Sequence, residues 1–358
     1  MICGMAIPAL RKGAAAAAAV AIATVVGGCG GGSSHSSATT GTSSPSAHTT
    51  TEPPLTATGP SAVVATGIPF PENVAVDPHG GVWAASATLN QKPSEGVWYV
   101  PPGGRPRHVG LSGATALLWL GNRLYEADNT GPGRGRVSRL EGFTGNGFAH
   151  RRVLLTGLPV GSRVIGSIVR GPDDRLFIGL AALGDQSGPP GHVLSFAQSG
   201  GRPTVQASGL RTDFGLAFWG QHLLVTVNGP DLAGKSPDEL QSFVPGGKVV
   251  DFGFPKCYGQ GGSACAGFPA ALVTLPSHST PEGIAVKGDV AFVAAYGSSV
   301  PQAPAGTQIL RVDLRTGRVS SFWRSPVPHD LIGGLAIGPD GNLYAPLAVS
   351  GKVVRFNL

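Results

Sequence analysis

The sequence predicts an all-β fold, a six-bladed β-propeller of four-stranded blades, over residues 61–358. The composition is the first reason: the chain has 56 glycines and 31 prolines, only 13% charged residues and few stretches with helical periodicity. Such a composition favours many short strands separated by turns. The second reason is a strand–turn–strand unit that recurs along the chain, and the third is the spacing of its copies.

The repeated unit is a short apolar strand, a tight turn and a second apolar strand. It reads NVAVDPHGGVWAAS from residue 73, ALLWLGNRLYEAD from 116, SIVRGPDDRLFIGL from 167, GLAFWGQHLLVTV from 215, GIAVKGDVAFVAA from 283 and GLAIGPDGNLYAPL from 334. Between the equivalent positions Val74, Leu117, Ile168, Leu216, Ile284 and Leu335 the steps are 43, 51, 48, 68 and 51 residues. Four-stranded sheets of this size bury both faces when they pack radially around an axis, which is a propeller.

The two ends of the repeat region predict how the ring closes. The last copy reaches Leu358 after only three strands, and the segment SAVVATG at 61–67 can supply the fourth. This closure removes an exposed sheet edge. Two smaller β domains are the alternative, but no linker supports them. The longest step places an insertion, residues 228–279, in blade 4.

The N-terminus carries a targeting segment over residues 1–28. Arg11 and Lys12 precede an Ala-rich apolar stretch that is short for a membrane span, and the stretch ends in Val-Gly-Gly-Cys at Cys29. This pattern resembles the signal of exported actinobacterial, mycobacterial-type lipoproteins. The resemblance implies cleavage before Cys29 and a palmitate-type lipid anchor on its sulfur; an ordinary secretory signal is the alternative. Residues 29–60 are then a disordered Gly/Ser/Thr/Pro tether, on the extracytoplasmic face of the cell membrane.

Charge and cysteine content limit the partners. Without Arg11 and Lys12, 24 basic and 20 acidic residues remain, and no Lys/Arg block stands among them, which argues against nucleic acid binding. Cys257 and Cys265 lie in CYGQGGSAC. In an oxidising compartment this spacing predicts a disulfide that closes a small loop. Too few further ligands stand nearby for a zinc site.

The loops that lead into the innermost strands of a propeller open at one end of its channel. Their polar residues are Glu72, Arg163, Arg211, Asp213, Glu282, His329 and Asp330. We expect these side chains to form a polar ligand site at that end. The alternative is that each is a solvated loop residue or part of a salt bridge within the propeller.

Two stretches carry a family resemblance. GLRTDFGLAFWGQHLLVTVNGPDLAGKSPDELQSF with FGFPKCYG, and GPDDRLFIGLAALGDQSG, resemble the soluble quinoprotein glucose/sorbosone dehydrogenase family, best over about 160–260. The resemblance implies pyrroloquinoline quinone (PQQ) at the channel mouth, bound through calcium and arginine. By position, Arg211 matches a cofactor-contacting arginine, and Arg163 is the second arginine expected to contact the cofactor. The Gly229 and Pro230 carbonyls match calcium ligands, with Asp231 beside them, although Gly-Pro also marks an ordinary turn.

The same resemblance assigns further roles. It implies that Asp238 and Glu239 lie near a second, structural calcium and that Asp185 is an acid beside the catalytic base. The base itself is a histidine in the family, and counting back from Gly171 places Arg163 there. Because arginine stays protonated, it cannot act as that base, so His329 and Asp330 are the candidate substitutes, or the chain does not oxidise sugars. We therefore expect PQQ and calcium as cofactors only if the chain still oxidises sugars without the family histidine.

Two other classes of function remain open. FPENVAVD and TPEGIAV resemble the strand entry of metal-dependent gluconolactonase-like hydrolases, with Glu72 or Glu282, Asn228 and Asp231 as ligands of one divalent metal. A non-catalytic propeller that binds a glycan or an envelope protein is the third class. In each case we expect a monomer whose partner is a small sugar or polyol, or an envelope component.

Overall fold

The structure is a computed structural model. It describes residues 59–86, 95–111, 113–131, 133–161, 163–184, 188–230, 237–259, 261–297, 306–327 and 329–358. The expected signal peptide, Cys29, nearly all of the tether, Asp185 and Asp231 lie outside the described residues. The chain divides into two compact units, residues 1–52 and 53–358, and all that follows concerns the second.

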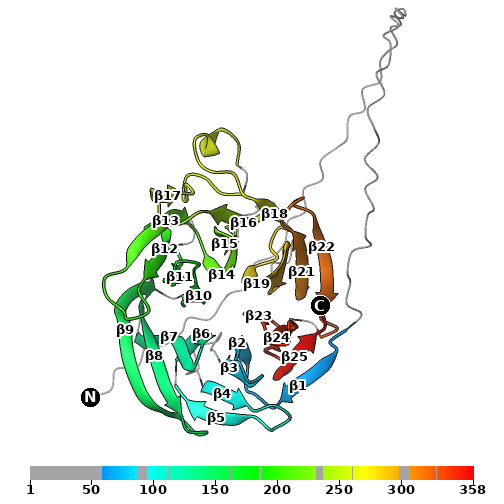
Figure 1. Cartoon of the computed structure of the whole chain (residues 1–358). Helices are drawn as coiled ribbons and strands as arrows, with labels where there is room; N and C mark the ends of the chain where they lie inside the picture. Colours follow the sequence, from blue (N-terminus) through cyan, green and yellow to red (C-terminus); the bar gives the residue numbers. More distant parts are fainter. Residues whose placement is uncertain are drawn as a thin grey trace, which may run out of the picture. The chain divides into compact units, whose positions relative to one another are not determined.

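Six antiparallel sheets of four strands stand around a central channel, which confirms the predicted propeller (Figure 1). The first three blades are β2 (Pro71–Val76), β3 (Val82–Ser86), β4 (Gly96–Val100) and β5 (Arg107–Gly110); β6 (Ala114–Leu120), β7 (Arg123–Gly131), β8 (Gly133–Phe143) and β9 (Phe148–Gly161); β10 (Ile168–Arg170), β11 (Leu176–Leu180), β12 (Gly191–Phe196) and β13 (Thr204–Leu210). Blades 4 to 6 are β14 (Asp213–Trp219), β15 (His222–Val227), β16 (Asp238–Phe243) and β18 (Val273–Leu275); β19 (Pro281–Lys287), β20 (Val290–Ala295), β21 (Gln308–Asp313) and β22 (Val319–Arg324); β23 (Ala336–Ile337), β24 (Leu343–Leu347), β25 (Lys352–Phe356) and β1 (Ala62–Thr66).

The ring closes through the N-terminal strand, as the sequence predicts. β1 pairs antiparallel with β25, with Ala62 opposite Arg355 and Thr66 opposite Lys352. Blade 6 therefore takes three strands from the end of the domain and one from its beginning. With this closure blade 6 also has four strands, and β1 covers the outer edge of β25.

Aspartates in the first turn of a blade explain why the same motif recurs. Asp77 Oδ1 accepts the N–H groups of His79 and Gly81, both at 2.9 Å, and Oδ2 accepts the indole N–H of Trp83 at 3.0 Å. One side chain thus fixes the turn and the second strand, which is what short polar residues do in tight turns. Asp340 repeats the arrangement in blade 6, where it binds the N–H of Asn342.

The core lies between the blades rather than inside one of them. Six clusters of buried apolar residues each join two neighbouring blades, and the cluster of blades 6 and 1 includes Ala65 and Ile68 from the closing segment. Burial of each large apolar side chain contributes roughly 1.5–3 kcal/mol. No blade is therefore stable by itself, and the ring holds together as one unit.

Blade 4 differs from the sequence-based boundaries. β16 and β18, its two outer strands, lie inside the predicted insertion 228–279, so the true excursion is residues 244–272. Its short strand β17 (Val250–Asp251) pairs in parallel with β13 of blade 3, and a 3₁₀ turn, η1, spans Gly262–Cys265. The predicted disulfide between Cys257 and Cys265 is present there.

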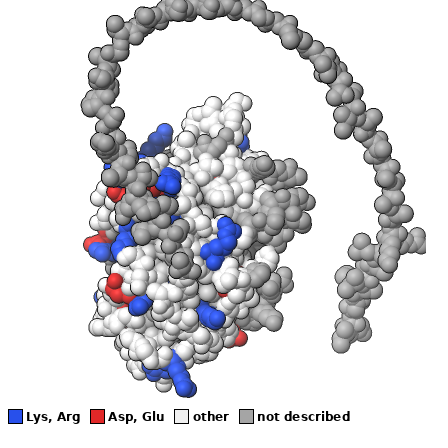
Figure 2. Space-filling view, turned by 90° about the vertical axis from the view of Figure 1, so that its right-hand side faces the viewer, with Lys and Arg blue, Asp and Glu red and all other residues white. Residues whose placement is uncertain are grey.

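The surface agrees with the mild net charge. Figure 2 shows one side of the molecule, on which Lys and Arg side chains are scattered among uncharged residues and do not gather in one patch. Within the described ranges, no helix has the length and apolar character needed to cross a bilayer.

Candidate functional site

The inner strands meet closely where they enter the channel. Hydrogen bonds link residues of neighbouring blades near these entries. They run from Leu117 N to Asn73 Oδ1 (3.3 Å), Thr115 Oγ1 to Ile165 O (2.9 Å), Thr226 Oγ1 to Glu282 O (2.7 Å), Gly283 N to Gly333 O (2.5 Å) and Gly334 N to Glu72 O (2.6 Å). We call this ring of contacts the collar. Asn73 also donates to the Gly166 carbonyl of blade 3 at 3.0 Å, so its amide braces three blades.

Glycine makes the collar possible. A Cβ on Gly215 would overlap the carbonyl oxygen of Glu282, and a Cβ on Gly333 would lie 2.5 Å from the carbonyl oxygen of Glu72. A Cβ on Gly166 would lie 2.7 Å from the backbone of Phe214, at the junction of blades 3 and 4. Only a residue without a side chain permits backbones to approach this closely.

The inner strands of all six blades line a cavity of about 330 Å³, and Asn73, Leu117 and Leu216 are among its lining residues. Collar residues thus belong to its wall, whereas neither Glu72 nor Glu282 lines it. We call the polar strand-entry end of the channel, where these two glutamates stand, the mouth.

Two half-buried glutamates lie at the mouth. Glu72 and Glu282 occupy equivalent positions, each the second residue of an inner strand, in blades 1 and 5. Burial raises the pKa of the Glu72 carboxyl to about 7. Burial, and then the nearby Glu72 carboxyl, raises the pKa of Glu282 well above its usual range, while Arg163 acts in the opposite direction. The two side chains therefore form an acid pair in a largely dry environment.

Tyr296 completes this group. It follows β20, and burial, with Glu72 and Glu282 nearby, raises the pKa of its phenol. Both its hydroxyl oxygen and Glu72 Oε1 are buried and lack a hydrogen-bond partner among the described residues. At the entrance edge of blade 4, Thr212 Oγ1 and Asn228 Oδ1 are buried without a partner in the same way. Such atoms are rare in folded proteins, because an unmet hydrogen bond costs about 1–3 kcal/mol.

Arg163 lies in the segment before β10. Its charge influences the Glu282 carboxyl, and its backbone N–H donates to the Val160 carbonyl at 2.9 Å. An arginine near a carboxyl group holds charge and cannot remove a proton. That it stands in the place of a family histidine stays a prediction from the sequence.

Arg211 is used to hold the backbone. Its side chain is buried, and Nη1 donates to the carbonyls of Asn228 at 3.2 Å and Gly229 at 2.7 Å. The space beside it measures only about 10 Å³. The guanidinium therefore braces the turn that includes Pro230, whose ring is itself buried.

Asp238 also has a structural position. Its Oδ1 accepts the N–H of Gly229 at 2.8 Å, and Oδ2 accepts the Ser279 hydroxyl at 3.0 Å and the Thr280 N–H at 2.9 Å. The carboxylate thus ties blade 4 to the loop that enters blade 5. The next residue, Glu239, projects from the opposite face of β16, and its Oε2 accepts a hydrogen bond from Gln241.

The two residues predicted to replace the base lie in blade 6. His329 is exposed, with a left-handed backbone φ of 55°. Asp330 is buried and accepts the N–H and the hydroxyl of Ser350 at 2.7 and 2.6 Å, so its carboxylate secures a loop. We therefore leave Asp330 out of the proposed site; its catalytic role and that of His329 remain predictions.

Sequence reasoning missed Tyr296. Its signal is weak: a tyrosine that directly follows a strand whose last five residues, Ala291 to Ala295, are buried. The metal-site hypothesis finds no support in the part of the chain that the structure describes, where no three His, Cys, Asp or Glu side chains gather as metal ligands.

Comparison with known proteins identifies solved structures with the same fold. No protein family and no curated protein matches the chain. Three solved structures share its fold: the PQQ-bound aldose sugar dehydrogenase of Streptomyces coelicolor (18% identity, TM-score 0.66, 83% of this chain and 96% of that one), the holo PQQ domain of Coprinopsis cinerea pyranose dehydrogenase (15%, 0.67, 82% and 94%) and the calcium structure of a Trichoderma reesei carbohydrate-active enzyme of family AA12 (14%, 0.62, 82% and 94%). The chain is thus a six-bladed propeller with the fold of PQQ-dependent, glucose dehydrogenase-like proteins.

The described residues do not fit PQQ held by Arg211 and a calcium ion on the Gly229 and Pro230 carbonyls. The Arg211 guanidinium already binds the Gly229 oxygen, and a second cation there would compete for that oxygen and be repelled. A space of about 10 Å³ holds one water molecule at most, whereas PQQ is a tricyclic tricarboxylate. We derive no chemical step through the quinone.

Proposed function

We propose that this chain is a glucose dehydrogenase-like propeller that binds a sugar or polyol at its mouth and does not oxidise it. The supporting observation is the group of buried polar atoms without partners, Glu72 Oε1 and the Tyr296 hydroxyl, beside Glu282. A ligand rich in hydroxyl groups can supply the missing hydrogen-bond partners, because each hydroxyl both donates and accepts a hydrogen bond.

The charge of the mouth favours a neutral ligand. The raised pKa of Glu282 favours its neutral form, and Glu72, with a pKa of about 7, is close to half protonated at neutral pH. Together with the single charge of Arg163 these groups sum to a small net charge, which attracts neither a strong anion nor a strong cation. Sugars and polyols are neutral, and a carboxylic acid and a carboxylate both hydrogen-bond to hydroxyl groups.

The test is calorimetric titration of the purified chain with aldoses and polyols, such as glucose, arabinose and sorbitol. We expect at least one to bind, and Glu72→Gln to weaken binding roughly tenfold or more, in line with the loss of a charge-assisted hydrogen bond. Glu282→Gln loses a carboxyl O–H donor, and we expect it to weaken binding as well. Glu95→Gln, at an exposed position, is the matched control. No binding by any member of the panel, or equal affinity in all three variants, contradicts the proposal.

A second measurement separates binding from oxidation. Addition of PQQ and calcium is expected to leave the melting temperature unchanged, since only a ligand of the folded state raises it. No dye reduction is expected with any sugar, either in the native chain or in Arg163→His. A melting temperature that rises with PQQ, together with dye reduction, would instead show that the chain is a dehydrogenase.

We also propose that the propeller acts at the extracytoplasmic face of the cell membrane, through a lipid on Cys29. The Val-Gly-Gly-Cys pattern supports this proposal. Metabolic labelling with a fatty acid analogue tests it: the native chain should become labelled and Cys29→Ala should not. Labelling of both, or of neither, would contradict lipidation at this residue.

A further inference from the structure

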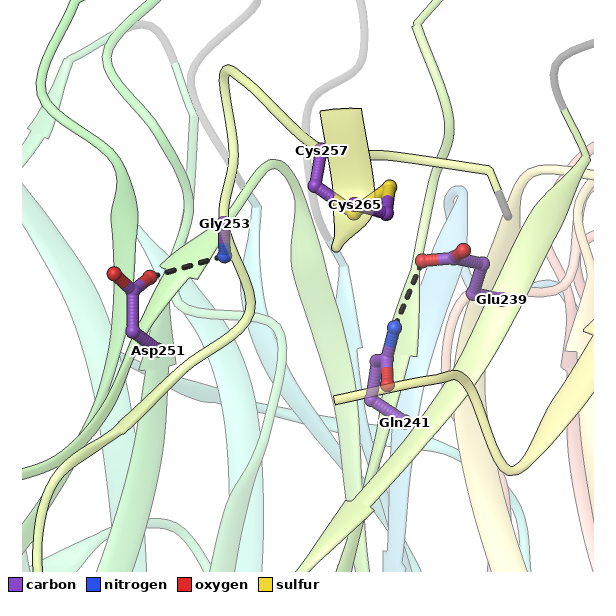
Figure 3. Close-up of a disulfide and its surroundings, with 6 residues drawn as sticks. All are labelled: Glu239, Gln241, Asp251, Gly253, Cys257 and Cys265. Carbon is purple, nitrogen blue, oxygen red and sulfur yellow. Dashed lines mark hydrogen bonds between the residues drawn. A yellow bond between two sulfur atoms is a disulfide. The ribbon is translucent and has the colours of Figure 1, made fainter. Parts of the chain in front are cut away.

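A second cavity, of about 320 Å³, lies between β16 and the blade 4 excursion. Its lining residues are Glu239, Gln241, Phe252, Cys257, Gly262, Cys265, Ala266, Phe268, Pro269, Ala270 and Ala271. Figure 3 shows the disulfide across from the side chains of Glu239 and Gln241. We call this cavity the insertion pocket.

The polar wall of the insertion pocket comes from β16. Glu239 and Gln241 stand two residues apart and so project from the same face of the strand. They are only 7% and 4% exposed, and Gln241 Nε2 donates to Glu239 Oε2 at 2.9 Å (Figure 3). Gln241 Oε1 is buried and has no hydrogen-bond partner among the described residues. Buried carbonyl oxygens normally accept a hydrogen bond, so a ligand that donates one is expected here.

The opposite wall is apolar and firmly held. Phe252 and Phe254 donate their backbone N–H groups to the carbonyls of Ser208 and Gly209 in β13, at 3.0 and 2.9 Å. The disulfide closes the following loop. The excursion is therefore fixed to blade 3 on one side and faces blade 4 on the other, so the pocket is already formed before any ligand arrives, as ligand sites usually are.

We propose that the insertion pocket binds a small organic amine in its protonated form, with the ammonium group at Gln241 Oε1 and the Glu239 carboxylate. The apolar part of the amine then lies among Phe252, Phe268 and Pro269. The faces of the two aromatic rings also attract the positive charge of the ammonium group nearby. A single water could satisfy Gln241, but it occupies only about 30 Å³ and would leave most of the pocket unfilled.

The proposal is tested by NMR and calorimetric titration of the full chain with phenethylammonium. Its uncharged counterpart 3-phenylpropan-1-ol and calcium chloride are titrated in parallel. We expect the amine to bind at least tenfold more tightly than the alcohol, and calcium to give no response. Equal affinity for amine and alcohol, or a response to calcium alone, would overturn the assignment.

Variants then locate the site. Gln241→Met keeps the size of the side chain and removes the acceptor, and we expect at least a tenfold loss of affinity for the amine. Gln198→Met, the same change on blade 3, is the matched control and should bind normally.

If Gln241→Met proves unstable, Ala271→Leu offers an independent check. It narrows the pocket without touching its polar wall, and it should lower affinity while the protein stays folded. Unchanged affinity in a folded Gln241→Met or Ala271→Leu variant would contradict the proposal.

Discussion

Replacement of Glu72 by glutamine should stabilise the propeller, and only above about pH 5. The carboxyl has its ordinary pKa of 4.5 in the unfolded chain and a pKa of about 7 in the fold, where burial disfavours the ionised form. Between these values the unfolded chain releases a proton that the folded chain keeps, so stability falls as the pH rises. At about 1.4 kcal/mol per pH unit, the loss reaches about 3 kcal/mol by pH 7 to 8.

Glutamine has a similar shape and never ionises. Urea unfolding of the native chain and Glu72→Gln should therefore give nearly equal free energies at pH 4 and a gain of about 3 kcal/mol for the variant at pH 8. Glu282 and Tyr296 lie near Glu72, Arg163 lies near Glu282, and all three are present in both proteins. Glu95→Gln serves as the exposed control. A variant that loses stability at pH 8, or gains equally at both pH values, would refute the argument that Glu72 is buried and uncompensated.

Three further changes test the scaffold. Gly215→Ala should cost about 1–3 kcal/mol in the free energy of unfolding, because the new methyl group overlaps the collar, whereas exposed Gly247→Ala should be near neutral in the same urea titration. Serine at both Cys257 and Cys265 should lower that free energy by about 2–3 kcal/mol, and a melting temperature unchanged by the replacement would contradict this. Arg151→Met should cost about 2–3 kcal/mol, since Arg151 pairs with buried carboxylates of blade 2; thermal unfolding of the variant with an unaltered midpoint would argue against it.

The architecture is readable from the sequence because its causes are local and periodic. A strand–turn–strand unit marks each blade, in blades 1, 3 and 6 with an aspartate such as Asp77 in the turn, and the missing fourth strand points to residues 61–67. The disulfide is predicted from the short spacing of the two cysteines and an expected oxidising compartment. What the sequence does not show is how the blade 4 segment divides, because the pairing of β17 with β13 joins residues far apart in the chain.

The site is only partly predictable. The strand-entry rule brings Glu72, Glu282 and Arg163 to one mouth, since position in the repeat determines where a residue enters the channel. It does not determine where each side chain finds its partner. Arg211 and Asp238 meet backbone groups of the neighbouring loops, and these contacts depend on how closely the blades pack.

The collar ties the strand entries of neighbouring blades to one another. The Asn73 amide alone bonds to blades 2 and 3, and the glycines let the backbones of neighbouring blades approach closely. The groups of the mouth are therefore held in place by the ring as a whole, and a replacement in the collar of one blade is expected to move side chains of the mouth that belong to another blade.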